Sequence, residues 1–246
     1  MKGDINKIIA GMPVVILAGG AGINLGLNSS IIPKTMVEVN GVPLLLYIMD
    51  HYSKAGFRKF IICAGHGLEK IKELPGLSRK DWDVNIVDTG INNMTGSRLA
   101  QVSSMVDYSS VFCLTYGDTL SDVNLRDLLL FHLSHGRTAT LLAAHNPTRF
   151  RILGLYDVDD IVKGFSERPV LEKDYVCGGF YIFNREIFAL KKLSVDPACV
   201  LETDVLEELV SKKELYAYRY NGFWQPLDNE RDRKNLSLSL KKTDKT

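Results

Sequence analysis

The sequence lacks any long hydrophobic run, and no stretch approaches the roughly 20 apolar residues that a membrane-spanning helix needs. Residues 1–12 carry two lysines and an acid, without the apolar stretch that marks a secretory signal. We therefore expect a protein that neither crosses a membrane nor carries a cleaved signal peptide.

The sequence also lacks an excess of positive or negative charge. Thirty lysines and arginines stand against 29 aspartates and glutamates, which leaves a formal charge of +1. Proteins that bind nucleic acids usually present an excess of basic residues. The balance therefore gives no support to a nucleic-acid partner.

Cysteine is scarce, and the few thiols are too far apart to form a C-x-x-C pair. Three of the four lie in apolar, strand-like runs. We therefore expect buried, reduced thiols in a cytoplasmic protein. The residues are Cys63, Cys113, Cys177 and Cys199.

What is present is an ordinary globular composition, with 46% hydrophobic and 24% charged residues. The length of 246 residues suits one large α/β domain. No repeat, linker-like stretch or low-complexity segment divides it. We expect a single domain over residues 1–246, with a polar, disordered tail at 241–246.

Strand-like and helix-like segments alternate over the first two thirds of the chain. Such alternation predicts a mostly parallel, Rossmann-like sheet with helices on both faces. Short alternating segments over 151–183 predict an antiparallel extension. The expected strands are 14–18, 60–64, 84–87, 111–115, 138–144 and 215–220, and the expected helices are 43–55, 96–106, 124–135, 202–212 and one after Asp228.

A glycine-rich loop follows the first strand and reads Leu17-Ala18-Gly19-Gly20-Ala21-Gly22. Glycines let the backbone approach a ligand, and their N–H groups can cradle phosphate oxygens. A Walker A loop needs Gly-Lys-Ser/Thr, which is absent. A dinucleotide fingerprint should open into a helix and precede an acid, but Pro33 disfavours the helix and the second strand ends without an acid. On these residues alone, a tight strand exit is an equally good interpretation.

A third type of phosphate loop fits better, because further motifs follow it in order along nearly the whole chain. With them the sequence resembles the sugar-nucleotide pyrophosphorylases, and in its Thr-Gly-Ser-Arg-Leu and Gly-Phe-Trp-Gln-Pro-Leu-Asp segments the glucose-1-phosphate cytidylyltransferase branch. The motifs are Pro33-Lys34-Thr35-Met36-Val37-Glu38-Val39, Gly41-Val42-Pro43-Leu44, Val87-Asp88-Thr89-Gly90, Met94-Thr95-Gly96-Ser97-Arg98-Leu99, Thr115-Tyr116-Gly117-Asp118, Phe165-Ser166-Glu167-Arg168-Pro169, Gly178-Gly179-Phe180 and Gly222-Phe223-Trp224-Gln225-Pro226-Leu227-Asp228.

The resemblance implies that a sugar-phosphate oxygen attacks the α-phosphorus of CTP and releases pyrophosphate. Such chemistry needs neutralised phosphates and an in-line approach more than a protein nucleophile. By the same resemblance Mg²⁺ is held by Asp118 and Asp228. Asp118 also follows a buried strand, where open α/β sheets bind their ligands, although a turn or capping aspartate is as good an interpretation there.

The resemblance assigns further roles. Lys34 acts with Asp118 as a catalytic residue by contacting phosphates, although a lone lysine is by default a solvated surface residue. The expected nucleotide-binding residues are Leu17, Ala18, Gly19, Gly20, Gly22, Thr95, Gly96 and Arg98, and a structural ion pair stays open for Arg98. The expected sugar-phosphate residues are Glu167, Arg168, Gly178 and Gly179, and the two glycines could equally mark a β-bulge.

Two histidines three apart, His132 and His135, have a spacing that can serve a metal ion. Their segment is strongly apolar and is followed by Gly136. We favour a helix end over a metal site here.

Three positions depart from the family pattern: Asn24 replaces the loop arginine, Arg168 a lysine and Cys177 an asparagine. Two hypotheses follow. The first is an active cytidylyltransferase with CTP and a sugar 1-phosphate as partners. The second is a catalytically weakened relative that binds nucleotide or sugar phosphate as a regulatory or scaffolding subunit. Retention of Lys34 and both aspartates favours the first, and homo-oligomerisation stays open.

Overall fold

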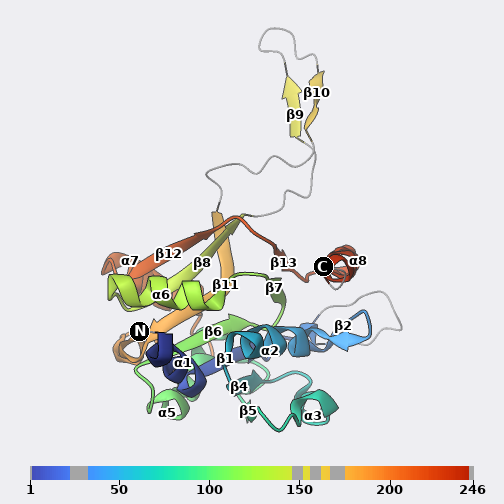
Figure 1. Ribbon diagram of the computed structural model, residues 1–246. Coiled ribbons are helices and arrows are strands. Elements are labelled where there is room, and N and C mark those ends of the chain that lie inside the picture. Colours follow the sequence, from blue (N-terminus) through green and yellow to red (C-terminus); the bar gives the residue numbers. More distant parts are fainter. Residues whose placement is uncertain (1, 23–32, 146–151, 156–161, 167–174, 244–246) are drawn as a thin grey trace.

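The computed structural model describes residues 2–22, 33–145, 152–155, 162–166 and 175–243. A seven-stranded sheet forms its centre (Figure 1). All neighbouring strands are parallel, except that β11 runs antiparallel to β6 and β8. The predicted mostly parallel sheet is therefore confirmed. In spatial order the strands are β12 (Leu215–Tyr220), β8 (Ala139–His145), β11 (Tyr175–Asn184), β6 (Val111–Tyr116), β1 (Pro13–Ala18), β4 (Lys59–Ala64) and β5 (Asp83–Asp88).

Three short antiparallel pairs accompany the sheet, namely β2 (Glu38–Val39) with β3 (Val42–Pro43), β7 (Thr119–Ser121) with β13 (Trp224–Pro226), and β9 (Ile152–Leu155) with β10 (Val162–Ser166). The pair β9–β10 and strand β11 confirm antiparallel strands in 151–183. The helices are α1 (Lys2–Gly11), α2 (Leu44–Ala55), α3 (Leu68–Lys72), α4 (Thr95–Gln101), α5 (Ser103–Val106), α6 (Leu125–His135), α7 (Glu207–Ser211) and α8 (Glu230–Thr243), with single turns η1 (Lys34–Met36), η2 (Pro75–Leu77), η3 (Arg185–Ala189) and the π-helical η4 (Leu201–Leu206).

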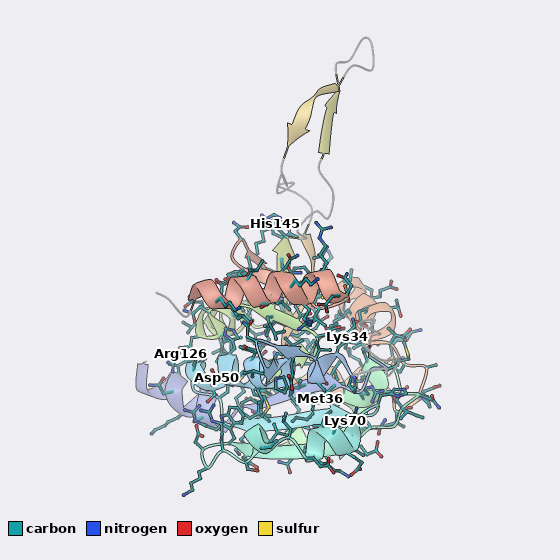
Figure 2. The ribbon with its side chains drawn as sticks, turned by 90° about the vertical axis from the view of Figure 1, so that its right-hand side faces the viewer. Lys34, Met36, Asp50, Lys70, Arg126 and His145 are labelled. Atoms are coloured by element: carbon teal, nitrogen blue, oxygen red, sulfur yellow. The ribbon has the colours of Figure 1, made fainter. Side chains whose placement is uncertain are left out.

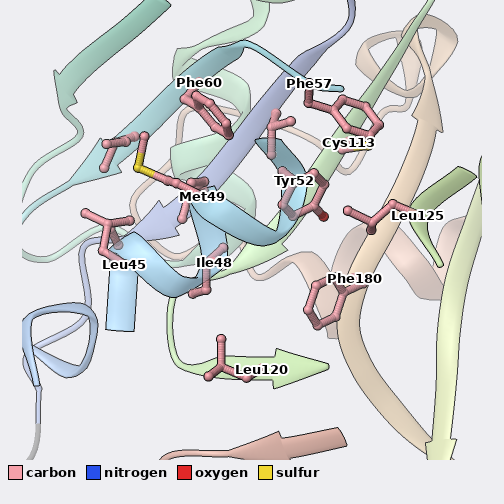
Figure 3. Close-up of a cluster of buried hydrophobic side chains, with 14 of the residues drawn as sticks. Leu45, Ile48, Met49, Tyr52, Phe57, Phe60, Cys113, Leu120, Leu125 and Phe180 are labelled. Carbon is pink, nitrogen blue, oxygen red and sulfur yellow. The ribbon is translucent and has the colours of Figure 1, made fainter. Parts of the chain in front are cut away.

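Helices cover both faces of the sheet. Successive side chains of a strand point to opposite sides, so each face of the sheet has its own hydrophobic core. In β1, Val14 and Ile16 enter one core with α2 and α6, whereas Val15 and Leu17 enter a second core with α4, η4 and α7. Figure 3 shows the first core, where α2 packs Tyr52 against the sheet. A strand buried on both faces explains why its sequence is a continuous apolar run.

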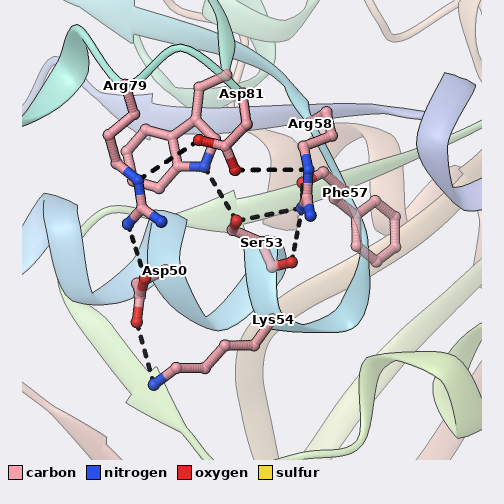
Figure 4. Close-up of polar contacts among 8 residues, drawn as sticks. Asp50, Ser53, Lys54, Phe57, Arg58, Arg79 and Asp81 are labelled. Atoms are coloured by element: carbon pink, nitrogen blue, oxygen red, sulfur yellow. Dashed lines mark hydrogen bonds and ion pairs between the residues drawn. The ribbon is translucent and has the colours of Figure 1, made fainter.

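Helix α2 agrees with the predicted helix 43–55. It ends at Gly56, whose positive φ of 108° suits a residue without a Cβ. A polar cluster then ties its last turns to the segment before β5 (Figure 4). There Arg79 pairs with Asp50 at 3.0 Å and Trp82 Nε1 donates to Ser53 Oγ at 3.0 Å.

Two of the predicted helices are not the regular α-helices that we expect from the sequence. The helix 96–106 is broken at Val102, where φ is −100° and ψ is 10°, although this residue stays buried. The helix 202–212 begins as the π-helix η4, whose wider turn buries both Leu201 and Leu206. Packing at these points overrides a uniform α-helical repeat. The last helix also reaches Thr243, so the expected tail is partly helical.

The two histidines of α6 have structural partners. His132 Nδ1 lies 2.9 Å from Thr140 Oγ1, and its Nε2 lies 3.1 Å from Asn184 Oδ1. Across the described ranges, no three His, Cys, Asp or Glu side chains gather as a metal site. The helix ends at Gly136 with φ 63°, which confirms the predicted helix end.

All four cysteines are free, and three are buried as expected. Burial raises the pKa of the Cys63 thiol to about 12. Cys177 is exposed, which corrects the expectation for that thiol, because it lies where β11 loses its regular register. None of the helices in the part of the chain that the structure describes is long and apolar enough to cross a bilayer.

We expect His132 to make the stability pH-dependent, since burial lowers its pKa from 6.5 to about 4. The unfolded chain then binds a proton at a pH where the folded protein does not. The free energy of unfolding should be highest above about pH 6.5 and should decrease by on the order of 2 kcal/mol as the pH is lowered towards 4. Urea unfolding of wild type and His132→Asn at pH 7, 5.5 and 4.5 tests this, and parallel pH profiles for the two proteins would contradict it.

Candidate functional site

The topology places a crevice between the carboxyl ends of β1 and β6. From β1 the chain moves to β4 and β5 on one side, and then returns to β6 on the other side. Ligands of open α/β sheets bind at such a reversal of strand order. The glycine-rich loop follows β1 and Asp118 follows β6, so both lie at this edge. A cavity of about 430 Å³ opens there.

Most of the predicted nucleotide-binding residues line this cavity. They are Leu17, Ala18, Gly19, Gly20, Gly22, Thr95 and Arg98, and both predicted catalytic residues, Lys34 and Asp118, join them. Gly96 does not, because it is buried against Cys199, whose Sγ would lie 2.6 Å from a Cβ at that position. Several other lining residues have no role in the sequence analysis, among them Thr35, His66, Ile91 and Tyr116.

Lys34 joins the two predicted metal carboxylates. Its Nζ lies 2.9 Å from Asp118 Oδ2 and 2.7 Å from Asp228 Oδ1. Figure 2 views the side of the molecule that carries α8 and labels Lys34 there. The pairing of β7 with β13 brings the aspartates together, and Leu227 N donates to Asp118 O at 2.8 Å. The alternative of an unpaired, solvated lysine at position 34 is therefore wrong.

The charges of this cluster are mutually stabilising. Partial burial alone would lower the pKa of Lys34, but the carboxylates of Asp118 and Asp228 outweigh that effect and raise it. Lys34 therefore stays cationic. Two carboxylates that reach the same cationic atom are also close enough to share a metal ion, and carboxylate oxygens are ligands that Mg²⁺ accepts. The donor set thus fits a divalent cation.

Arg98 holds the glycine-rich loop by a hydrogen bond to the loop's backbone. Its buried guanidinium donates to Gly19 O at 2.9 Å, to Ala64 O at 3.2 Å and to Thr89 Oγ1 at 2.6 Å. Burial lowers the pKa of Arg98, although an arginine keeps its proton in proteins. The side chain thus joins the ends of β1, β4 and β5 and adds a positive charge to the cavity wall.

Glu202 of η4 connects two lining residues and was not foreseen. Its carboxylate accepts hydrogen bonds from Thr95 Oγ1 at 2.9 Å and from the hydroxyl of Tyr116. Thr95 Oγ1 in turn accepts from Leu201 N at 2.9 Å. In the sequence Glu202 is one of four acids within residues 201–208, and nothing in that segment distinguishes it from the other three. The π-helical turn thereby fixes the cavity wall formed by the start of α4.

The predicted sugar-phosphate residues are described only in part. Glu167, Arg168 and the loop residue Asn24 lie outside the described residues. Gly178 and Gly179 lie at the register shift of β11, which confirms the β-bulge interpretation. Gly178 O accepts from Trp224 Nε1 at 2.8 Å, and a Cβ on Gly179, whose φ is 72°, would lie 3.2 Å from the Tyr116 ring. The bulge therefore lies beside Tyr116, a residue of the cavity wall.

A crevice at this position with these charges suits a Rossmann-like, nucleotide-binding protein that transfers phosphorus groups. The chain belongs to the nucleotidyl transferase family, whose model matches residues 13–228. It is 35% identical to the glucose-1-phosphate cytidylyltransferase of Salmonella typhi over 244 residues, which cover 90% of this chain and 93% of that protein. It is also 27% identical to the catalytic subunit beta of Drosophila melanogaster mannose-1-phosphate guanylyltransferase, over 90% of this chain and 61% of that protein.

Solved structures share the fold. HddC from Yersinia pseudotuberculosis superposes with a TM-score of 0.67 at 20% identity, over 93% of this chain and 99% of that one. A Bacillus anthracis protein in complex with sucrose gives a TM-score of 0.71 at 16% identity, over 93% and 94% of the two chains. These likenesses establish the Rossmann-like architecture.

We expect Gly19→Ala to disturb the loop, because the added Cβ would overlap the guanidinium of Arg98. Overpacking of this kind costs about 1–3 kcal/mol. Gly20→Ala is a matched control, because a Cβ there meets nothing within 4 Å. Thermal unfolding without ligand should show a lower Tm for Gly19→Ala and a nearly unchanged Tm for Gly20→Ala. Equal Tm values for the two variants would show that the position of Arg98 does not require a glycine at position 19.

Proposed function

We propose that this chain is a cytidylyltransferase that joins CTP to a sugar 1-phosphate, glucose 1-phosphate or a similar one, and releases pyrophosphate. The observation that carries the proposal is Lys34 held between Asp118 and Asp228 at the mouth of a glycine-lined cavity. The choice of CTP and glucose 1-phosphate is supported by the 35% identity to the Salmonella typhi enzyme.

The proposed reaction needs no covalent bond to the protein. A phosphate oxygen of the acceptor attacks the α-phosphorus, a new P–O bond forms, and the bond to the β-phosphate breaks. Backbone N–H groups of the glycine-rich loop are suited to hold phosphate oxygens, while Lys34 supplies a point charge beside them. Arg98 keeps the loop in place. The protein's part is to orient the triphosphate and to balance its charge.

Nucleotidyl transferases generally act with a divalent metal ion. We propose Mg²⁺, held by the carboxylates of Asp118 and Asp228. Bound there, the ion would neutralise phosphate charge and make the α-phosphorus more electrophilic. Because both carboxylates contact Lys34, the same cluster would place the lysine next to the phosphates.

The second candidate is a weakened relative that binds nucleotide without efficient turnover. Asn24 supports it, because an arginine at that place in the loop brings a charge that asparagine lacks. Arginines that stabilise phosphoryl-transfer transition states contribute about 10³–10⁵ in rate. The two candidates differ in turnover rather than in binding.

Pyrophosphate release from CTP, UTP, dTTP, ATP and GTP against a panel of sugar 1-phosphates tests the proposal. We expect CTP with glucose 1-phosphate to be preferred. Asp118→Asn and Asp228→Asn should each lower kcat by about 10²-fold or more, because each removes a charge from the cluster. Asp83→Asn, at the opposite end of the sheet, is the control and should act like wild type. Full turnover in either cluster variant would refute the assignment.

Asn24→Arg distinguishes the two candidates. If Asn24 reflects a decayed site, the arginine should raise pyrophosphate release about 10-fold or more. If another cation serves instead, such as Arg149, Arg151 or Arg168, the rate should stay flat or fall. We expect the second outcome, because Arg168 can form a bidentate phosphate contact where the family has lysine. Steady-state release by wild type, Asn24→Arg and Arg168→Lys measures it, and a large gain over a nearly silent wild type would favour the binding protein.

A further inference from the structure

Thr35 of η1 carries a buried hydroxyl without a partner. Only 3% of the residue is exposed, and its Oγ1 has no hydrogen bond among the described residues. The residue nevertheless lines the cavity. Buried hydroxyls in native folds are nearly always bonded to protein, water or ligand. A buried, unbonded hydroxyl on a residue of the cavity wall is therefore a candidate ligand contact.

The side chain is held in one orientation. Its Cγ2 methyl fills the space over Gly117, so that a Cβ on that glycine would collide with it. Threonine has few χ1 states, because two heavy atoms branch at its Cβ. The hydroxyl cannot take the place of the methyl without losing this contact. It is thereby kept on a different side of the residue from Gly117.

The neighbours of Thr35 place it at the charged end of the cavity. Lys34 precedes it, and Asp118 follows the glycine that its methyl covers. Ile91 and Met94, which also line the cavity, are exposed apolar residues. A ligand group beside Lys34 is expected to be anionic. Its oxygens would accept a hydrogen bond, and a hydroxyl can donate one.

We propose that Thr35 binds the phosphate chain of the nucleotide, with its hydroxyl donating to a non-bridging phosphate oxygen. The proposal rests on the proposed function and adds to it a binding residue for the triphosphate, distinct from the base and the sugar. A valine has nearly the same shape without the hydroxyl, whereas a serine keeps the hydroxyl without the methyl. These two variants separate the hydrogen bond from the packing.

Calorimetric titration of wild type, Thr35→Val and Thr35→Ser with CTP, and with pyrophosphate in the presence of Mg²⁺, tests the proposal. Thr35→Val should bind both ligands about 10-fold more weakly, which is the effect of losing one hydrogen bond to a charged group. Thr35→Ser should stay within about threefold of wild type. Without ligand, Thr35→Val should be at least as stable as wild type, because it removes a buried hydroxyl that has no partner.

The failures are distinguishable. If wild type binds neither CTP nor pyrophosphate, the proposed function fails and the role of Thr35 fails with it. If wild type binds both and Thr35→Val binds equally well, only the role of Thr35 is overturned. A marked loss of stability in Thr35→Val without ligand would also overturn it, since the hydroxyl would then have a structural partner.

Discussion

The ion pairs of Lys34 are the interaction on which the functional edge of this protein depends. One ammonium group contacts carboxylates that are 84 and 194 residues away in sequence. An isolated surface ion pair contributes little to stability. Here Lys34 is partly buried, with 27% of its side chain exposed, and it lines the cavity together with Asp118. The main consequence of the ion pairs is positional, since they fix three charges against the glycine-rich loop.

The sheet makes this meeting point possible. Strand β1 is buried on both faces and lies where the strand order reverses, so its carboxyl end faces a gap between crossovers. The loop that leaves β1 is held by Arg98, whose bonds reach the ends of β4 and β5 as well. A single buried guanidinium thus couples three strand ends. The absence of a side chain at Gly19 is what allows it to lie so close.

Local patterns in the sequence predict the helices and strands but not the long-range contacts between them. Strands such as β1 and β6 were found because their apolar runs are continuous, and α2 because proline and Gly56 bound it. The break at Val102 and the π-turn at Glu202 were missed, because both follow from packing against distant segments. The ion pair of Lys34 with Asp228 likewise depends on the β7–β13 pairing. Only the resemblance to the family predicts that these residues belong to one site.

The charge balance of the cavity explains why the cluster suits a metal-dependent reaction. Lys34 and Arg98 supply two positive charges, and Asp118 with Asp228 supplies two negative ones, so the described cluster is close to neutral. A nucleoside triphosphate brings several negative charges into this space, and the burial of Arg98 makes unbalanced charge costly. Within the described residues, Lys34 already has its charge matched by two carboxylates. A divalent cation on those carboxylates would offset their charge and leave that of Lys34 for the phosphates. The same pair of aspartates would then set both the metal position and the availability of the lysine.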